Sequence, residues 1–441
     1  MFDIFWADDY QLVGRTAIGK PSHAFTGSGR FWPLGICDYC ILLLFGSYGR
    51  SVVAHYAYNC VVMILSSLML LAFLNKITKD KNLISVFCLL LLFSTSSFLL
   101  IHMSCIFPER MIFFMFAAFM LCAAKGCEKQ STLYYCATFL AAAYATYLKE
   151  QIFGVVAIIV ATNLIFGENS RKDRIFYCSL LANSAIFVAI YVYRHFFRDQ
   201  GKPYAQIISN FSELSFAQFN NEPILYLIAT IAFIRTYSIL IKKDKSRVFT
   251  DSLLFAGVGN TLAYSLLKLY SPYYVFPSIL LSIPALAVFL SKGKKFKIIG
   301  AVLSAILCSL LSIRNSKEQA INIWKHREED HFIFDRLINE YQSGKDVYWI
   351  SLEYEDPLYK KLDKKKFEAY EFFLNYYFGR KFPLKKIMNL DQLTKNSVAI
   401  FSEETALAPS FSVVSKKLEE KGLKLSQTLT DLTSRIYRSE N

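Results

Sequence analysis

Long runs of apolar residues, separated by short charged segments, dominate the chain between residues 53 and 313. Most runs hold roughly 16 to 22 residues, which is the length that an α-helix needs to cross the hydrocarbon core of a bilayer. The pattern predicts ten membrane-spanning helices, at residues 53–74, 83–104, 110–125, 131–148, 151–167, 175–194, 223–241, 249–267, 272–291 and 297–313.

The pattern changes after Ile313, where shorter amphipathic and alternating stretches replace the apolar runs. They predict helices near 316–343, 367–378 and 410–421, and strands near 347–350, 397–401 and 433–437. We therefore expect an α-helical polytopic membrane protein with about ten transmembrane helices and a small C-terminal α/β soluble domain. The expected domains are an outer-face segment with interfacial helices (1–50), a transmembrane domain (51–313) and an extracytoplasmic α/β domain (314–441).

Composition and charge narrow the class of protein. The chain is 54% hydrophobic and only 19% charged, which is far too apolar for an ordinary soluble enzyme of 441 residues. Its net charge of +14 arises mainly before residue 314, where 27 Lys and Arg face 15 Asp and Glu, against 22 and 20 in the tail. The excess therefore belongs to loops between spans, so we expect a lipid bilayer and no nucleic acid as partner.

The loops alternate in charge along the chain. One set of alternate loops contains sixteen cations, namely Lys76, Lys79, Lys81, Lys125, Lys129, Arg171, Lys172, Arg174, Lys242, Lys243, Lys245, Arg247, Lys292, Lys294, Lys295 and Lys297. The other set contains six, namely Arg110, Lys149, Arg194, Arg198, Lys202 and Lys268. The positive-inside rule places the first set in the cytoplasm and the N-terminal segment, the second set and the tail outside. Arg235, within a span, is expected to extend toward the cytoplasmic interface.

Short motifs exclude several kinds of site. Cys37 and Cys40 have CxxC spacing, but no second pair or histidine set accompanies them, which argues against a zinc or redox centre. No Walker-type phosphate loop, GxGxxG, HExxH or GxSxG occurs in a suitable context. Candidate chemistry is thus confined to polar residues on the predicted outer face.

The most unusual polar residues lie near the N-terminus. Asp8 and Asp9 are adjacent carboxylates, which repel each other unless a cation, a metal ion or a raised pKa relieves the repulsion. They precede Arg15 and Arg30 in a stretch rich in Gly, Arg and aromatic residues, which is typical of a membrane interface.

Two charged dipeptides are placed tightly against predicted span ends on the same face. Glu109-Arg110 follows Pro108, and Lys149-Glu150 occupies a turn of almost no length between two spans. Cations can neutralise a phosphate, a carboxylate can accept the proton of an attacking hydroxyl, and lipid-facing helices can hold a prenyl chain. Transfer of a sugar from a lipid carrier matches these requirements.

Five short motifs resemble those of the GT-C superfamily of integral-membrane glycosyltransferases in their order along the chain and in their side of the membrane. The resemblance is strongest to bacterial relatives of protein mannosyltransferases, aminoarabinose transferases and O-antigen glucosyltransferases. The motifs are Asp8-Asp9-Tyr10, Gly29-Arg30-Phe31, Glu109-Arg110, Lys149-Glu150 and Tyr273-Tyr274 before Pro277. The resemblance extends over residues 1 to about 313 in layout. It implies an inverting hexosyltransferase in a bacterial cytoplasmic (inner) membrane, with active site and C-terminal domain facing the periplasm.

The resemblance also implies roles for individual residues. Asp8 or Asp9 would be the base toward the acceptor hydroxyl, and the same pair is the candidate site for a divalent cation, Mg²⁺ or Mn²⁺. Substrate-binding roles fall to Arg15, Arg30, Glu109, Arg110, Lys149, Glu150, Tyr273 and Tyr274, with Lys268 as substitute for an Arg that relatives often have before the second tyrosine. The implied partners are a polyprenyl-phosphate-linked sugar and a glycan or lipid acceptor, as in lipopolysaccharide or other polysaccharide biosynthesis.

One departure and several alternatives accompany this interpretation. The family usually has a transmembrane helix before its first outer loop, whereas Asp8 lies seven residues after the start, so we expect a truncated or misassigned start that can leave the chain inactive. An O-antigen or capsule polymerase and a non-enzymatic membrane assembly protein are the alternatives. A transporter is disfavoured because the sequence contains no evident inverted repeat or paired broken helices.

Overall fold

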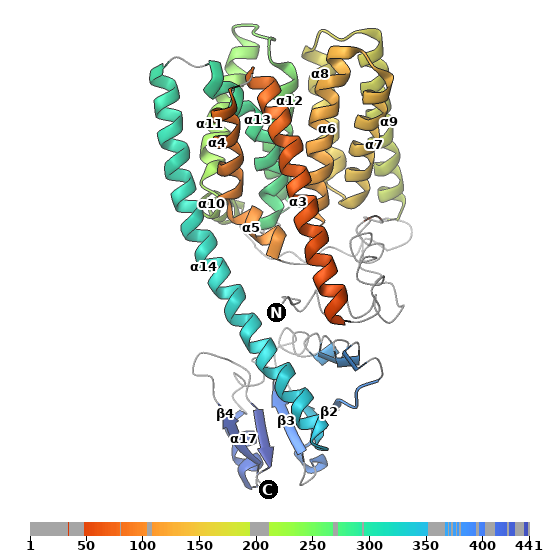
Figure 1. Ribbon diagram of the computed structural model, residues 1–441, viewed down its shortest axis with the longest axis vertical. Helices are drawn as coiled ribbons and strands as arrows, with labels where there is room; N and C mark the ends of the chain where they lie inside the picture. Colours follow the sequence, from red (N-terminus) through yellow and green to blue (C-terminus); the bar gives the residue numbers. More distant parts are fainter. Residues whose placement is uncertain are drawn as a thin grey trace. The chain divides into compact units, whose positions relative to one another are not determined.

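A computed structural model gives the fold of the chain. It describes Leu34 and residues 48–79, 81–103, 108–194, 211–267, 272–292, 295–351, parts of 367–378, 381–393, 397–401, 411–420, 423–427 and 436–439. Residues 54–319 belong to one compact unit and the elements after residue 320 to another. The first unit is a bundle of helices, and the second is built around a sheet (Figure 1).

A helix lies over each of the ten predicted spans. The elements of the bundle are α3 (Tyr48–Thr78), α4 (Asn82–Phe93), α5 (Ser96–Met103), α6 (Glu109–Lys129), α7 (Thr132–Leu148), α8 (Ile152–Phe166), α9 (Arg171–Tyr193), α10 (Phe211–Asn221), α11 (Ile224–Leu240), α12 (Val248–Leu266), η4 (Pro272–Val275), α13 (Phe276–Lys292) and the first part of α14 (Lys295–Gln342). Within the described residues, five helices are long and apolar enough to cross a membrane, or six with the bent α4 and α5 pair. The chain is thus an integral membrane protein.

The span predicted over 83–104 is broken. Its two halves, α4 and α5, meet at 69°. At the break the hydroxyls of Ser94 and Thr95 donate hydrogen bonds of 2.8 and 2.7 Å to the carbonyls of Leu91 and Leu92, which satisfies the carbonyls that end α4. Polar side chains at the middle of an apolar run therefore turn one predicted span into two short helices.

Local sequence sets the helix starts that matter for the site. Pro108 precedes α6, where its fixed φ suits a helix start, and Glu109 in the first turn is stabilised by the positive helix end. Helix α9 begins with a capping box in which Ser170 and Asp173 exchange side-chain to backbone hydrogen bonds.

Helix α13 forms the centre of the bundle. The span that contains it, Tyr273–Lys292, is 94% buried, and α4, α6, α11 and α12 pack around it. Phe276 at its start contacts the rings of Phe98 and Phe113 at centroid distances of 6.2 and 5.7 Å. The outer helices instead expose large apolar side chains, as a surface in contact with lipid requires, among them Val61, Leu140, Ile186, Phe233 and Leu303.

The helices alternate in direction, so the described loops of the two predicted sets lie at opposite ends of the bundle. Figure 1 places α5 and α10 together at one end, where η4 packs against both. We call this the α5 end; it contains the starts of α6 and α8. The opposite end contains the described loop residues 79, 81, 130–131, 167–170 and 241–247, and we call it the cationic end.

The C-terminal unit has the predicted α/β character. Its five strands are β1 (Asp346–Ile350), β2 (Lys385–Ile387), β3 (Ser397–Phe401), β4 (Leu423–Gln427) and β5 (Ile436–Ser439), in the order β2-β1-β3-β5-β4. The pairs of β1 with β2 and with β3 are parallel, and those of β5 are antiparallel. Helix α17 (Phe411–Glu420) and helical residues within 367–378 confirm two predicted helices.

Two strands were not predicted, and both lie at sheet edges. The edge strands β2 and β4 contain the sequences Lys-Lys-Ile and Leu-Lys-Leu-Ser-Gln, which lack a long apolar run. Lysines are common in edge strands because they discourage pairing with other chains. The helix predicted over 316–343 is also not separate, since α14 continues without interruption from the last span to Gln342.

Candidate functional site

An ion pair between Glu109 and Lys149 is the centre of the candidate site. Glu109 is in the first turn of α6, and Lys149 lies between α7 and α8 with an extended backbone. The Nζ atom of Lys149 donates a hydrogen bond to Oε1 of Glu109, and both residues are buried. Such a pair forms a strong local contact because little water screens it.

Two tyrosines complete the surroundings of Lys149. Its Nζ atom lies 4.9 Å from the ring centroid of Tyr273 and 4.6 Å from that of Tyr274, both in η4. Tyr274 in turn stacks on Tyr264 of α12, with 4.4 Å between centroids and 5° between planes. The ammonium group therefore contacts a carboxylate and two aromatic faces, which hold it in place.

Arg110 adds a second buried cation beside this pair. Arg110 is only 1% exposed, and His102 of α5 lies at the same end of the bundle. The His102 ring is oriented by a 2.8 Å hydrogen bond between Nδ1 and the carbonyl of Phe98. Arg110 and Lys149 are thus two buried cations at this end, and the Oε2 atom of Glu109 has no hydrogen-bond partner among the described residues. Buried cations of this kind are typical of sites that bind an anion.

A buried carboxylate lies near η4 at the same end. Glu222 connects α10 to α11, is fully buried, and accepts a hydrogen bond from the backbone N–H of Ser97 at the start of α5. Burial raises the pKa of Glu222 to about 7, although this hydrogen bond opposes the shift. The carboxyl group is thus poised to exchange a proton near neutral pH.

The structure brings together only part of the predicted site. Lys149 contacts Glu109, Tyr273 and Tyr274, and Arg110 follows Glu109 on α6. Glu150 is half-buried in the turn after Lys149, and it makes no hydrogen bond or ion pair within the described part of the chain. Asp8, Asp9, Arg15, Arg30 and Lys268 lie outside the described residues. A search of the described residues finds no group of three or more His, Cys, Asp or Glu that could hold a metal ion.

Arg235 does not simply extend to the interface as expected. Its guanidinium is bidentate on Asp251, with Nε to Oδ1 at 2.8 Å and Nη2 to Oδ2 at 2.7 Å, and Nη1 donates to Asp244 at 2.9 Å. Hydrogen bonding by Ser246 and by Arg235 holds the pKa of Asp244 well below its usual range. The prediction was incomplete because it considered distance to the interface and did not consider Asp251, one turn into α12, as a partner.

Sequence reasoning also missed three residues of the α5 end. Tyr264 and His102 are single residues in apolar helices, and nothing in the sequence pattern marks them. Glu222 had one signal, since an acid directly before Pro223 at the start of a span is an unusual place for a charge.

Comparison with known proteins gives one informative match. No protein-family model and no curated protein sequence matches the chain. The crystal structure of ArnT from Cupriavidus metallidurans in the apo state is similar over 99% of this chain and 94% of that chain, with a TM-score of 0.56 and 9% sequence identity. Two structures of the oligosaccharyltransferase of Archaeoglobus fulgidus, one a complex with Zn and sulfate and one tethered to an acceptor peptide, give TM-scores of 0.44 at 13% identity, over 98% of this chain and 68% and 69% of theirs. The chain therefore shares the fold of the ArnT structure.

Proposed function

We propose that the chain is an inverting glycosyltransferase of the GT-C type, which moves a hexose-like sugar from a polyprenyl-phosphate carrier to a cell-surface glycan or lipid-linked acceptor. The observation that supports this proposal most directly is the buried Lys149, held between Glu109 and the rings of Tyr273 and Tyr274 with Arg110 nearby. This arrangement suits the phosphate of a lipid carrier.

In the proposed reaction the acceptor oxygen attacks the anomeric carbon as the bond between that carbon and the phosphate oxygen breaks. Asp8 or Asp9 takes the proton of the attacking hydroxyl, and Lys149 and Arg110 stabilise the charge that develops on the departing lipid phosphate. Arg15, Arg30 and Lys268 are further proposed contacts to phosphate or sugar. A single displacement of this kind inverts the configuration at the anomeric carbon.

The proposed setting is a bacterial inner membrane, with the α5 end and the C-terminal unit on the outer side. The loop charges support this orientation, because the described loops at the other end contain most of the basic residues. Asp8 and Asp9 are also the proposed site for Mg²⁺ or Mn²⁺, a role that loss of transfer after chelation by EDTA and its recovery with added Mg²⁺ would test.

The test is the surface-glycan profile, by mass spectrometry, of a deletion strain complemented with variants of the chain. The wild type should restore one hexose-like mass, and Asp8→Asn or Asp9→Asn should fail to restore it at equal membrane protein level. Lys242→Gln, a change in the loop at the cationic end, is the matched control and should restore it fully. An unchanged profile on deletion, or full restoration by both Asp variants, contradicts the proposal.

A further inference from the structure

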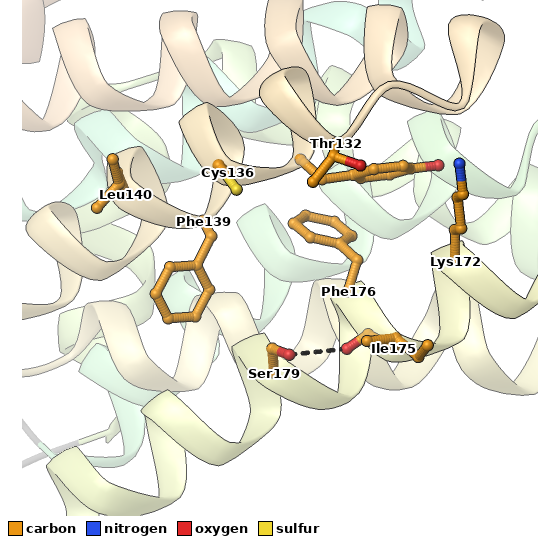
Figure 2. A pocket seen from close by; sticks show the side chains of 9 residues that line it. Thr132, Cys136, Phe139, Leu140, Lys172, Ile175, Phe176 and Ser179 are labelled. Atoms are coloured by element: carbon orange, nitrogen blue, oxygen red, sulfur yellow. Dashed lines mark hydrogen bonds between the residues drawn. The ribbon is translucent and has the colours of Figure 1, made fainter.

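An apolar groove of about 520 Å³ lies between α7 and α9 near the cationic end of the bundle. Figure 2 shows the rings of Phe139 and Phe176 beside the cavity and the amino group of Lys172 at one end of it. The lining residues are Thr132, Tyr135, Cys136, Phe139, Leu140, Lys172, Ile175, Phe176 and Ser179. The groove therefore combines an apolar body with a cation at one end.

The groove opens on the outside of the bundle. Leu140 and Ile175 on its rim are 66% and 59% exposed, and the adjoining helix α9 is long and apolar enough to span a membrane. Residues exposed in this way contact lipid, so the groove can take up an acyl chain directly from the bilayer. Its aromatic lining is favourable for such a chain because the rings present large apolar faces.

Basic residues are concentrated at the end of the bundle where the groove lies. Lys172 lines it, Arg171 and Arg174 on the same first turns of α9 are exposed, and Lys125 and Lys129 each lie 5.8 Å from the ring centroid of Tyr134 on α7. These five cations lie within one or two helix turns of the loops at this end of the bundle. In a membrane, this position corresponds to the depth of the lipid headgroups.

Three acidic residues at this end compensate only part of this charge. Asp173 turns inward and accepts hydrogen bonds from the hydroxyl of Tyr135 and the backbone N–H of Ser170. Glu128 is paired with Lys76. Glu168, the third acidic residue at this end, is exposed in the loop before α9. Residues 125–174 therefore place five cations and three acids at this end. This end keeps a net positive charge.

We propose that this groove is a binding site for an anionic phospholipid, with one acyl chain between α7 and α9 and the phosphate against Lys172. A zwitterionic lipid would gain little from the cations because it has no net charge. The polyprenyl-phosphate donor is the less suitable occupant, since the Lys149 cluster lies at the opposite end of the bundle. The site is independent of the proposed glycosyl transfer and depends only on the protein being in a membrane.

The test is native mass spectrometry of the full-length protein in detergent, with dioleoylphosphatidylglycerol or dioleoylphosphatidylcholine added at equal concentration. The wild type should retain the anionic lipid more tightly. Lys172→Gln should weaken that retention about fivefold, the equivalent of about 1 kcal/mol for one cation at a membrane surface. Cys136→Trp should weaken it at least as much because the indole fills the groove.

Two variants serve as matched controls. Lys242→Gln removes a cation at the same end but away from the groove, and Leu133→Trp adds an indole to an exposed position of α7 that does not line it. Both should bind the lipid like the wild type. If Cys136→Trp loses helix content by circular dichroism, Ser179→Trp fills the groove from the α9 side.

Three results would overturn the proposal. They are equal retention of the two lipids by the wild type, unchanged retention of the anionic lipid by both Lys172→Gln and a folded groove-filling variant, and displacement of the phospholipid by an equimolar polyprenyl phosphate. The last result would assign the groove to the donor instead.

Discussion

The two ends of the bundle each contain a buried ion pair, and the pairs differ in how completely they are satisfied. At the cationic end, Arg235 makes two hydrogen bonds to Asp251 and a third to Asp244. At the α5 end, Lys149 makes an ion pair to Glu109 and lies over the rings of two tyrosines. Among the described contacts, the first cation is held by two carboxylates, while the second contacts a carboxylate and two aromatic rings.

We propose that this difference separates a structural charge, Arg235, from a functional one, Lys149. Arg235 has two carboxylates as partners, so an added anion would have to displace one of them. Lys149 contacts a carboxylate and two aromatic rings, and Arg110 next to Glu109 is buried as well, so we propose that an anion binds beside these two cations. The comparison therefore predicts that the Arg235 network holds the fold and that the Lys149 cluster binds a phosphate.

The largest expected effect is on stability, in Arg235→Met. The change leaves Asp251, which is 1% exposed, without its bidentate partner, and breaking a buried pair from one side typically lowers the free energy of unfolding by about 3–5 kcal/mol. Thermal unfolding of the purified protein in detergent, followed by circular dichroism, measures it.

A double variant provides the control. Arg235→Met with Asp251→Leu removes both buried charges and should recover most of the lost stability, because replacing a buried pair by apolar residues is often neutral. Sugar transfer per folded molecule should match that of the wild type. Loss of transfer in the stable double variant would break the distinction between the two ends.

The next effect is on transfer, in Lys149→Gln. Removing a group that stabilises developing charge commonly lowers the rate by roughly 10²–10³-fold. The readout is the restored glycan mass in the complemented deletion strain, normalised to membrane protein level. Because Glu109 would be left buried alone, the single variant also loses stability, and it does not by itself separate the two roles.

The double variant Lys149→Gln with Glu109→Gln separates them. It removes both charges, so folding should recover as for the Arg235 pair, while transfer should stay low because the phosphate contact is absent. Recovery of both stability and transfer would show that the pair at the α5 end is structural as well.

The sequence predicted the fold more completely than the site. Apolar runs and their charged ends located a helix over each predicted span, because lipid enforces the same pattern on each crossing. The break at Ser94 and Thr95 was missed because their hydroxyls satisfy the backbone locally, which a hydropathy average does not register. The prediction divided α14 into a span and a separate helix because the composition changes near residue 313. The helical backbone nevertheless continues through this point.

The charged residues of the candidate site could be predicted from the sequence because charged residues are rare in its apolar part. Glu109, Arg110 and Lys149 were identifiable because charged residues at the end of an apolar run need a reason to be there. Tyr264 and Asp251 could not be identified in this way, because their roles as partners of Tyr274 and Arg235 depend on contacts between different helices. Tyr273 and Tyr274 were predicted only from the resemblance to a known family. Their contact with Lys149 is visible only in the folded structure.

A smaller effect concerns pH and Glu222. Its pKa is raised from 4.5 to about 7 in the folded protein, so folding retains a proton that the unfolded chain releases between these values. The free energy of unfolding should therefore fall as pH rises from about 4.5 to about 7, by up to about 3 kcal/mol, and then level off. Glu222→Gln should remove this part of the decline, whereas Glu318→Gln, at an exposed position, should keep it. Parallel curves for wild type and Glu222→Gln would contradict the assignment.

The smallest effect sharpens the role of the aromatic faces at the α5 end. Tyr274→Phe keeps the ring that lies 4.6 Å from Nζ of Lys149 and 4.4 Å from Tyr264, so transfer should stay within about twofold of the wild type. Tyr274→Leu removes the ring face and should lower transfer roughly fivefold, the equivalent of about 1 kcal/mol for one cation and ring contact. If Phe instead proved as damaging as Leu, the hydroxyl and not the ring would be the essential group. Tyr274 would then act by hydrogen bonding to a substrate. The aromatic rings around Lys149 would no longer explain why the two ends of the bundle differ in function.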